Sequence, residues 1–204
     1  MTEYLIYSQS LENYIIDLSS YIFVLILFYL IYLSNYIDRK TLIFFSLYSA
    51  TPFFVNDFLF SSTLLWDQYT NTYYLIDFRD HILNGNYQNY ITNMKSQERK
   101  LVLGAHLYGL IPFIFVNSIN TIAFANKLIL GLTSFYLLKN KYIKKSHLYF
   151  LLLFPATIIY SSLSLKEVLL AVSSIWVIIL FDKKKYFLVV FLFSSFFLLR
   201  PQFY

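Results

Sequence analysis

Long apolar runs separated by short charged turns dominate the pattern of this chain. The runs 21–32 and 148–159, for example, contain no charged residue. Because about 20 apolar residues cross the hydrocarbon core of a membrane, several such runs in succession predict a polytopic helical membrane protein. A transmembrane β-barrel would need alternating segments of about ten residues, and these runs do not alternate. The expected fold class is therefore all-α, a transmembrane helical bundle.

The pattern predicts about six spans in a single membrane domain. They lie at about residues 18–36, 41–60, 121–138, 148–164, 167–181 and 186–204. Residues 61–100 form one long polar stretch, which we expect to be an outer loop that holds an interfacial helix with aromatic anchors. Gly85 is expected to end that helix, since glycine suits the left-handed cap position. The run 101–118, broken by Gly104, Gly109 and Pro112, is interpreted as a re-entrant or interfacial segment.

Basic residues in the short turns orient these predicted spans. Two lysine clusters flank the apolar hairpin 147–181, namely Lys139, Lys141, Lys144 and Lys145 before it and Lys183, Lys184 and Lys185 after it. Lysine-rich short loops stay on the cytoplasmic side of a membrane. The hairpin tip, Lys166-Glu167, is then expected at the outer face, together with the end of the second span near Asp57.

Composition agrees with a membrane protein and excludes several classes of function. The 204 residues are 58% hydrophobic and only 13% charged, whereas soluble domains are about 25% charged. The net charge of +5 does not predict nucleic-acid binding, because the basic residues lie in turns and not along one stripe. With no cysteine and three histidines that lack metal-ligand spacing, neither an iron–sulfur cluster nor a zinc site is expected, and no cofactor is expected.

Acidic and basic side chains at the predicted outer face are the candidates for chemistry. Asp67 is the first candidate for a general base, and Asp57 is the alternative. Lysine and arginine suit recognition of a lipid-linked phosphate. The candidate substrate-binding residues are Lys166, Glu167, Arg79 and Arg200.

Each of these residues also has a structural explanation. Asp67 can be a solvated carboxylate on the interfacial helix, and Asp57 can mark the polar end of a span. Glu167 can complete a capping box that begins at Ser164. Arg200 can snorkel to the interface, and Arg79 can pair with a neighbouring carboxylate or with lipid phosphate.

The order of these residues is familiar. It comprises Asp67-Gln68-Tyr69, Gly85, Leu107-Tyr108, Pro112, Asn126-Lys127-Leu128, Phe154-Pro155-Ala156, Ser161-Ser162, Lys166-Glu167 and Leu199-Arg200-Pro201. Over about residues 41–204 this resembles the N-terminal half of bacterial GT-C-type glycosyltransferases. It also resembles similar multispan proteins encoded in O-antigen and capsule clusters, often labelled repeat-unit polymerases.

The resemblance implies a multi-pass protein of the bacterial inner membrane that transfers or polymerises polyprenyl-linked sugar units at the outer face. It implies that a carboxylate of the first outer loop, Asp67 or Asp57, is the catalytic base, and that Glu167 matches a second outer acidic residue. Gln68 stands where the family's Asp-Glu pair has its second member. The implied partners are a polyprenyl-phosphate-linked sugar, membrane lipids and other polysaccharide-assembly membrane proteins.

Two further functions stay open. A flippase or transporter needs ionisable or helix-breaking residues at mid-membrane. Pro52 and Pro155 break predicted spans, but no charge is expected near the span centres. A non-catalytic membrane fragment is the third interpretation, because the chain ends at 200–204 without a polar tail, as a truncated reading frame would.

Overall fold

The computed structural model describes residues 11–59, 77–78, 81–82, 84–86, 88, 118–163 and 166–199. These residues form helices and turns, and no strand occurs among them, so the all-α prediction is confirmed. The chain divides into two compact units. Unit 1 comprises Met1–Tyr69 and Phe113–Leu165, and unit 2 comprises Thr70–Pro112 and Lys166–Tyr204.

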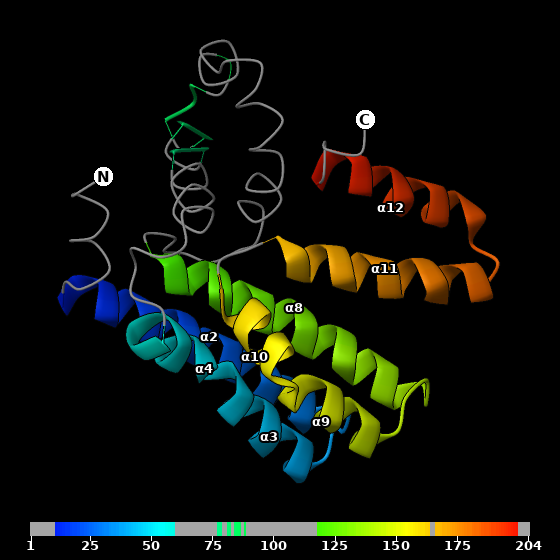
Figure 1. Ribbon diagram of the computed structural model, residues 1–204, viewed down its shortest axis with the longest axis horizontal. Helices are drawn as coiled ribbons and strands as arrows, with labels where there is room; N and C mark the ends of the chain where they lie inside the picture. The colour runs from blue at the N-terminus through cyan, green and yellow to red at the C-terminus, as the bar shows by residue number, and fades with distance from the viewer. Residues whose placement is uncertain are drawn as a thin grey trace. The chain divides into compact units, whose positions relative to one another are not determined.

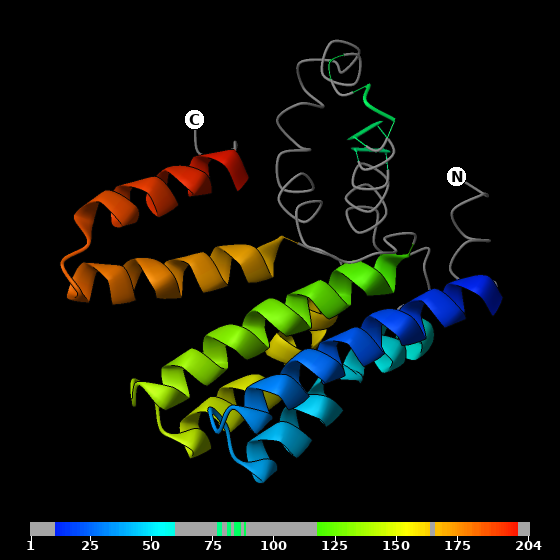
Figure 2. The same ribbon diagram turned by 180° about the vertical axis from the view of Figure 1, so that it is seen from behind.

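Two helical hairpins make up the described part of unit 1 (Figure 1). The first contains α2 (Leu11–Leu33), α3 (Arg39–Ser49), α4 (Thr51–Phe54) and the π-helical turn η1 (Val55–Leu59), and the second contains α8 (Ile119–Lys139), α9 (Lys145–Leu153) and α10 (Pro155–Ser162). The long helices α2 and α8 pack against each other and run in the same direction, as both views show (Figures 1 and 2). We call α3–α4–η1 and α9–α10 the returning arms of the two hairpins.

The two hairpins repeat the same turn. Each long helix ends at a residue in the left-handed region that is not glycine, Asn35 (φ 56°) in the first hairpin and Lys141 (φ 58°) in the second. The next residue, a tyrosine in both, donates its backbone N–H to the carbonyl five residues earlier. That bond defines a Schellman motif, which satisfies carbonyls that the end of a helix leaves open. Tyr-Ile follows in both turns, as Tyr36-Ile37 and Tyr142-Ile143.

The returning arms also repeat a break. Helix α3 ends at Ser49, and α4 begins at Thr51 with Pro52 in its first turn. Helix α9 ends at Leu153, and Pro155 is the first residue of α10. Proline has no backbone N–H and is tolerated only in the first turn of a helix, so each proline ends one helix and starts the next.

Six membrane spans are not supported by this architecture. Among the described residues, two helices are long and apolar enough to cross a membrane, over Tyr14–Leu33 in α2 and Asn120–Lys139 in α8. The predicted spans 41–60 and 148–164 correspond to the broken returning arms. At 1.5 Å per residue, α9 and α10 are only about 14 and 12 Å long, less than the roughly 30 Å of a hydrocarbon core. Runs of apolar residues locate the helices but not the breaks within them.

Unit 2 contains α11 (Glu167–Asp182) and α12 (Tyr186–Leu199), which pack as a third hairpin. These helices correspond to the predicted spans 167–181 and 186–204, and they have 16 and 14 residues. Gly85 has φ 69° and ends a helical turn in this unit, as predicted. The rest of the predicted outer loop 61–100 and the re-entrant segment 101–118 lie outside the described residues, apart from Ser118, the N-cap of α8.

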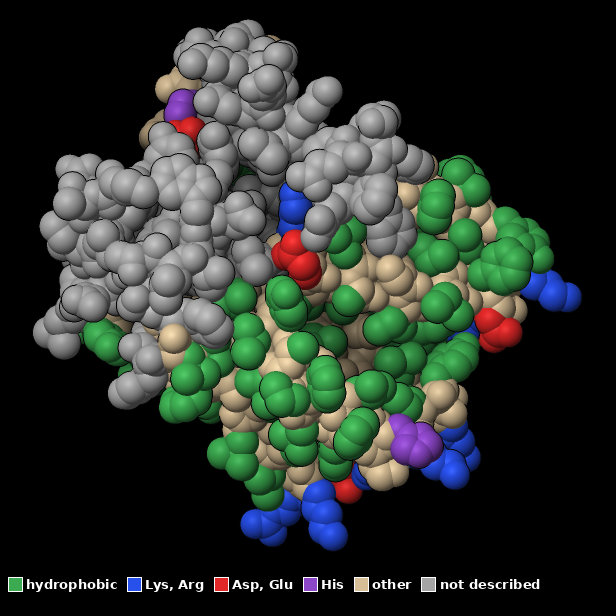
Figure 3. Space-filling view, viewed as in Figure 1, with side chains coloured by type: hydrophobic (Ala, Val, Ile, Leu, Met, Phe, Trp, Pro, Cys, Tyr) green, Lys and Arg blue, Asp and Glu red, His purple; other side chains and the backbone are tan. Residues whose placement is uncertain are grey.

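Basic side chains of unit 1 gather at its turn end, where Figure 3 shows them along the lower edge of the molecule. They belong to the two turns and the helix ends beside them, namely Arg39, Lys40, Lys139, Lys141, Lys144 and Lys145. Both turns lie at this end because α2 and α8 run in the same direction. The clustering agrees with the predicted placement of these turns on one side of a membrane.

Three buried aromatic rings form the contact between the hairpins. Phe28 of α2, Phe45 of α3 and Phe135 of α8 are at most 1% exposed, and their ring centroids lie 4.6 to 6.1 Å apart. Gly131 lets α8 approach them, because a Cβ at this position would lie 2.5 Å from Cζ of Phe28. The close packing of α2 and α8 therefore depends on glycine at position 131.

We predict that Gly131→Ala lowers the unfolding temperature of the detergent-solubilised protein. Overpacking costs about 1–3 kcal/mol, which exceeds the roughly 0.8–1 kcal/mol that alanine gains over glycine in a helix. Adding Phe28→Leu should recover part of the loss, and Leu132→Ala on the exposed side should change little. An unchanged or raised unfolding temperature for Gly131→Ala would contradict this packing.

Asp38 of the first hairpin contacts Lys145 of the second at the end of the unit where both turns lie. Its Oδ1 accepts a hydrogen bond from the Thr41 backbone N–H (3.2 Å), which makes it the N-cap of α3, and it also accepts one from the Thr41 hydroxyl. Lys145 at the start of α9 places Nζ 2.9 Å from the same oxygen. The hydrogen bonds from Lys145 and Thr41 lower the pKa of the Asp38 carboxyl to about 2.

Stability should therefore fall when Asp38 is protonated. A carboxyl whose pKa is lower in the folded state stabilises the protein above its unfolded pKa, about 3.9, and this contribution is lost as the pH falls toward 2. Asp38→Ala removes the helix cap, at about 0.5–2 kcal/mol, and an exposed ion pair, at about 0.2–1 kcal/mol. Asp38→Asn keeps an acceptor for the cap and should lose less. Unfolding measured from pH 5 to pH 2.5 tests this, and equal acid sensitivity in wild type and Asp38→Asn would refute it.

Candidate functional site

The predicted outer-face cluster lies mostly outside the described part of the chain. Asp67, Arg79 and Arg200 are not among the described residues, and Asp57 is described only as a backbone position in η1. Lys166 and Glu167 are described, at the start of α11 in unit 2. Their roles, and that of Asp57, stay predictions.

The capping box predicted for Ser164 and Glu167 lies only partly within the described residues, because Ser164 is not among them. Helix α11 begins at Glu167 with Lys166 as its N-cap, so Glu167 is the first helical residue and not the third. A carboxylate in the first turn still interacts favourably with the positive end of the helix dipole. The helix start was therefore predicted correctly to within a few residues, and the capping box stays a prediction.

A different group of polar residues is buried inside unit 1. Its charged members are Asp17 in α2 and Lys127 in α8, which are 4% and 1% exposed. Neutral polar residues surround these two. Some hydrogen-bond to Asp17 or Lys127 and the others hydrogen-bond to groups next to them. The buried ones are Ser118, Asn120, Asn126, Ser161 and Ser162. None of these seven residues is in the predicted site. We call them, with Tyr48, Thr51 and Asn56, the polar network.

Lys127 occupies the deepest charged position of the polar network. It is the ninth residue of α8, about 12 Å along the helix axis from its start and about 18 Å from its end. The expectation that no charge lies near a span centre is therefore wrong. Lys127 is the one charged residue in the run 119–138, and an ionisable residue inside a span indicates function by default. That signal was present in the sequence.

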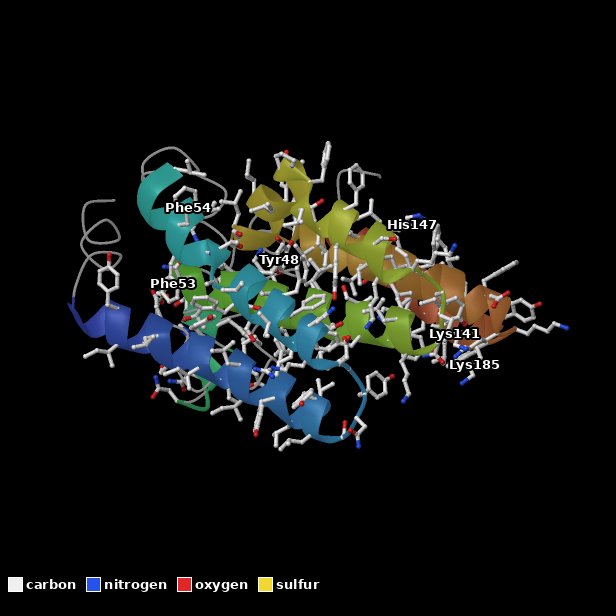
Figure 4. All side chains as sticks on the ribbon, turned by 90° about the horizontal axis from the view of Figure 1, so that it is seen from below. Tyr48, Phe53, Phe54, Lys141, His147 and Lys185 are labelled. Carbon is white, nitrogen blue, oxygen red and sulfur yellow. The ribbon has the colours of Figure 1, made fainter. Side chains whose placement is uncertain are left out.

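Two neutral groups hold the Lys127 ammonium. Nζ donates a hydrogen bond to Oγ of Ser161 over 2.6 Å and lies 3.8 Å from the ring centroid of Tyr48. The Tyr48 hydroxyl shares a 2.7 Å hydrogen bond with the same serine oxygen. Figure 4 shows Tyr48 among the helices of unit 1. Within the described residues, no carboxylate lies within ion-pair distance of Lys127.

Two asparagines satisfy the end of α10 beside this lysine. Nδ2 of Asn56 donates to the carbonyl of Ser162 over 2.9 Å, and Nδ2 of Asn126 donates to the carbonyl of Leu163 over 2.8 Å. A helix leaves its last four carbonyls without intrahelical partners. Inside a membrane such groups must find partners in the protein. Asn56 and Asn126 therefore have a complete structural explanation as side-chain caps of the broken arm.

Asp17 lies at the other end of the polar network, beside the start of α8. Its carboxylate accepts hydrogen bonds from the Ser118 hydroxyl and, over 2.9 Å, from Nδ2 of Asn120. Oδ1 of Asn120 in turn accepts a 2.6 Å hydrogen bond from Asn56. The positive end of the α8 dipole favours the negative charge there.

The network runs from Asp17 to Lys127 and reaches the break between α3 and α4 and the end of α10. Asn56 joins the Asp17 end to Ser162, and Ser162 adjoins Ser161, the partner of Lys127. The hydroxyl of Thr51, at the first break, lies 2.8 Å from that of Ser162. Residues of both hairpins thus converge where the break of the first arm meets the end of α10.

These side chains suit recognition of oxygen-rich or anionic ligands more than metal binding. Amides, hydroxyls and an ammonium donate hydrogen bonds to such ligands. Within the described part of the chain, no group of three or more histidine, cysteine, aspartate or glutamate residues could hold a metal ion. Comparison of the chain with protein-family models, curated proteins and solved structures finds no match. Function is therefore inferred from the residues themselves.

Proposed function

We propose that this chain is an integral membrane protein of bacterial surface polysaccharide assembly. It transfers or polymerises polyprenyl-linked sugar units at the outer face of the inner membrane. The observation that carries the proposal is the polar network, which places Asp17 and Lys127 inside two helices apolar enough to cross a membrane. Buried ionisable groups in such helices mark the path or site of a polar ligand.

The sequence resemblance supplies the substrate class and the reaction. The acceptor hydroxyl loses its proton to Asp67, or alternatively to Asp57, and its oxygen bonds to the anomeric carbon of the donor sugar. The bond between that carbon and the lipid diphosphate oxygen breaks, and the electron pair leaves with the lipid diphosphate. Lys166, Arg79 and Arg200 supply positive charge near that leaving group.

The charge distribution of unit 1 supports this orientation. Its basic turns are proposed to face the cytoplasm. The opposite end of the unit, which carries Asp17 and Asn56, then faces outward, where lipid-linked repeat units are joined. Other polysaccharide-assembly membrane proteins are proposed partners.

A flippase or transporter is the second candidate, and two observations favour it. Interrupted helices in corresponding positions of two repeats are typical of transporter binding sites, and Pro52 and Pro155 interrupt the arms in this way. Lys127 also lies inside a long apolar helix. A transporter needs an ionisable residue in such a position, and none was expected from the sequence.

The enzyme proposal is tested in a null strain complemented with Asp67→Asn or Lys166→Ala. Loss of a general base lowers a rate by about 10²- to 10⁴-fold, so Asp67→Asn should leave single lipid-linked repeat units at the outer face and little long-chain polysaccharide. Lys166→Ala should shorten the chains as well.

Matched controls are Asp182→Asn and Lys185→Ala, which change exposed residues of the α11–α12 turn. They should support normal polysaccharide. If Asp67→Asn and Lys166→Ala also give normal chain length and amount, the enzyme proposal fails. If the null strain accumulates repeat units on the inner leaflet instead, the transporter candidate replaces it.

A further inference from the structure

Among the described residues, the partners of Lys127 are fewer than a buried cation needs. An ammonium has three N–H donors. Ser161 accepts one of them, and the ring of Tyr48 faces a second. Among the described residues no carboxylate neutralises the charge. Burial of a charge is costly unless an opposite charge or further hydrogen bonds compensate it.

Helix capping alone does not explain a lysine at this position. The two carbonyls that end α10 already accept hydrogen bonds from Asn56 and Asn126. A neutral donor would satisfy Ser161 without the desolvation of a charge. Burial without an opposite charge disfavours the protonated form of a lysine. An anion bound beside Lys127 would stabilise that form, and the described residues do not provide one.

The position of Lys127 restricts the class of anion. The ammonium lies within α8, one of two described helices that are long and apolar enough to span a membrane. The end of α10 lies beside it, and Thr51 at the break of the first arm contacts that end. A group that reaches this depth must be attached to an apolar chain or enter through the protein. Phosphate esters bind lysine as a compact point charge.

We infer that Lys127, Tyr48 and Ser161 bind the phosphate group of an isoprenoid-linked sugar, an inference that rests on the proposed function. The third N–H of Lys127 donates to a phosphate oxygen. Ser161 accepts from the ammonium and donates its own proton to the Tyr48 oxygen, so the Tyr48 hydroxyl is free to donate to a second phosphate oxygen. The site is assigned to substrate binding only. Asp17, at the far end of the polar network, keeps its hydrogen bonds to Ser118 and Asn120.

The test is ligand-induced thermal stabilisation of the purified full-length protein in detergent. The probes are farnesyl phosphate, farnesol and inorganic phosphate. Farnesyl phosphate should stabilise the wild type, and the other two should have little effect. Equal stabilisation by farnesol would overturn the inference, because the phosphate would then contribute nothing. Equal stabilisation by inorganic phosphate would overturn the assignment to a lipid-linked group.

Lys127→Met should weaken farnesyl phosphate binding by about 10- to 100-fold, the range for loss of a hydrogen bond to a charged group. Lys139→Met is the matched control, because it removes the same charge from the exposed end of the same helix. It should bind as the wild type does. If Lys127→Met also binds like wild type, the inference is wrong.

Tyr48→Phe provides a second variant in case Lys127→Met does not fold. It removes one hydroxyl and keeps the ring beside Nζ, so binding should weaken. The unfolding temperature without ligand should fall by only the few degrees expected for loss of one hydrogen bond. Unchanged binding in Tyr48→Phe would remove this residue's assigned role.

The two proposals fail separately. If Lys127→Met retains binding while Asp67→Asn stops chain growth, the enzyme proposal stands and this site does not. If Lys127→Met loses binding while Asp67→Asn and Lys166→Ala make normal polysaccharide, the phosphate site stands and the enzyme proposal does not.

Discussion

The structure of unit 1 depends on one constraint, which is that backbone groups at a helix break inside an apolar bundle must find partners within the protein. Pro155 separates α9 from α10, and α10 is short enough to end within the bundle. Its last carbonyls accept hydrogen bonds from Asn56 and Asn126, one from each hairpin. The end of α10 therefore draws polar side chains from both hairpins to one place, and the contact between the hairpins becomes partly polar.

The polar surroundings of the end of α10 also allow a charged residue to be buried there. Once amides and hydroxyls surround the end of α10, the desolvation of a charge there is less costly than among apolar side chains. Lys127 uses this environment, with Ser161 as its hydrogen-bond partner and the Tyr48 ring over its ammonium. Within one polar network, some side chains thus cap the end of α10 and adjacent ones surround the lysine. The apolar contact of Phe28, Phe45 and Phe135 completes the interface between the hairpins.

Sequence patterning predicted the helices of unit 1 better than the features that make its site. The long apolar runs located α2 and α8, and the basic turns located the ends of the hairpins. Pro52 and Pro155 were predicted to break their spans, and both breaks are confirmed. Hydropathy did not show that the resulting helices are too short to cross a membrane. The repeated turn was not predicted either. The two turns are far apart in the chain, and the Tyr-Ile pair, at 36–37 and 142–143, is the main sequence feature that they share. Lys127 was visible as a lone charge in an apolar run, but its neighbours Tyr48 and Ser161 come together only through packing.

Disulfide formation between Thr51→Cys and Ser162→Cys tests most directly whether the break of the first arm meets the end of α10. The hydroxyl oxygens of these residues lie 2.8 Å apart, within the reach of a disulfide between short side chains. The chain has no cysteine of its own, so no other thiol competes. The account predicts that mild oxidation of membranes links this pair rapidly, while a pair of Leu47→Cys, which is 69% exposed, with Ser162→Cys stays reduced. Linkage of the Thr51 pair no faster than that of the control pair would contradict the two-hairpin arrangement and, with it, the polar network.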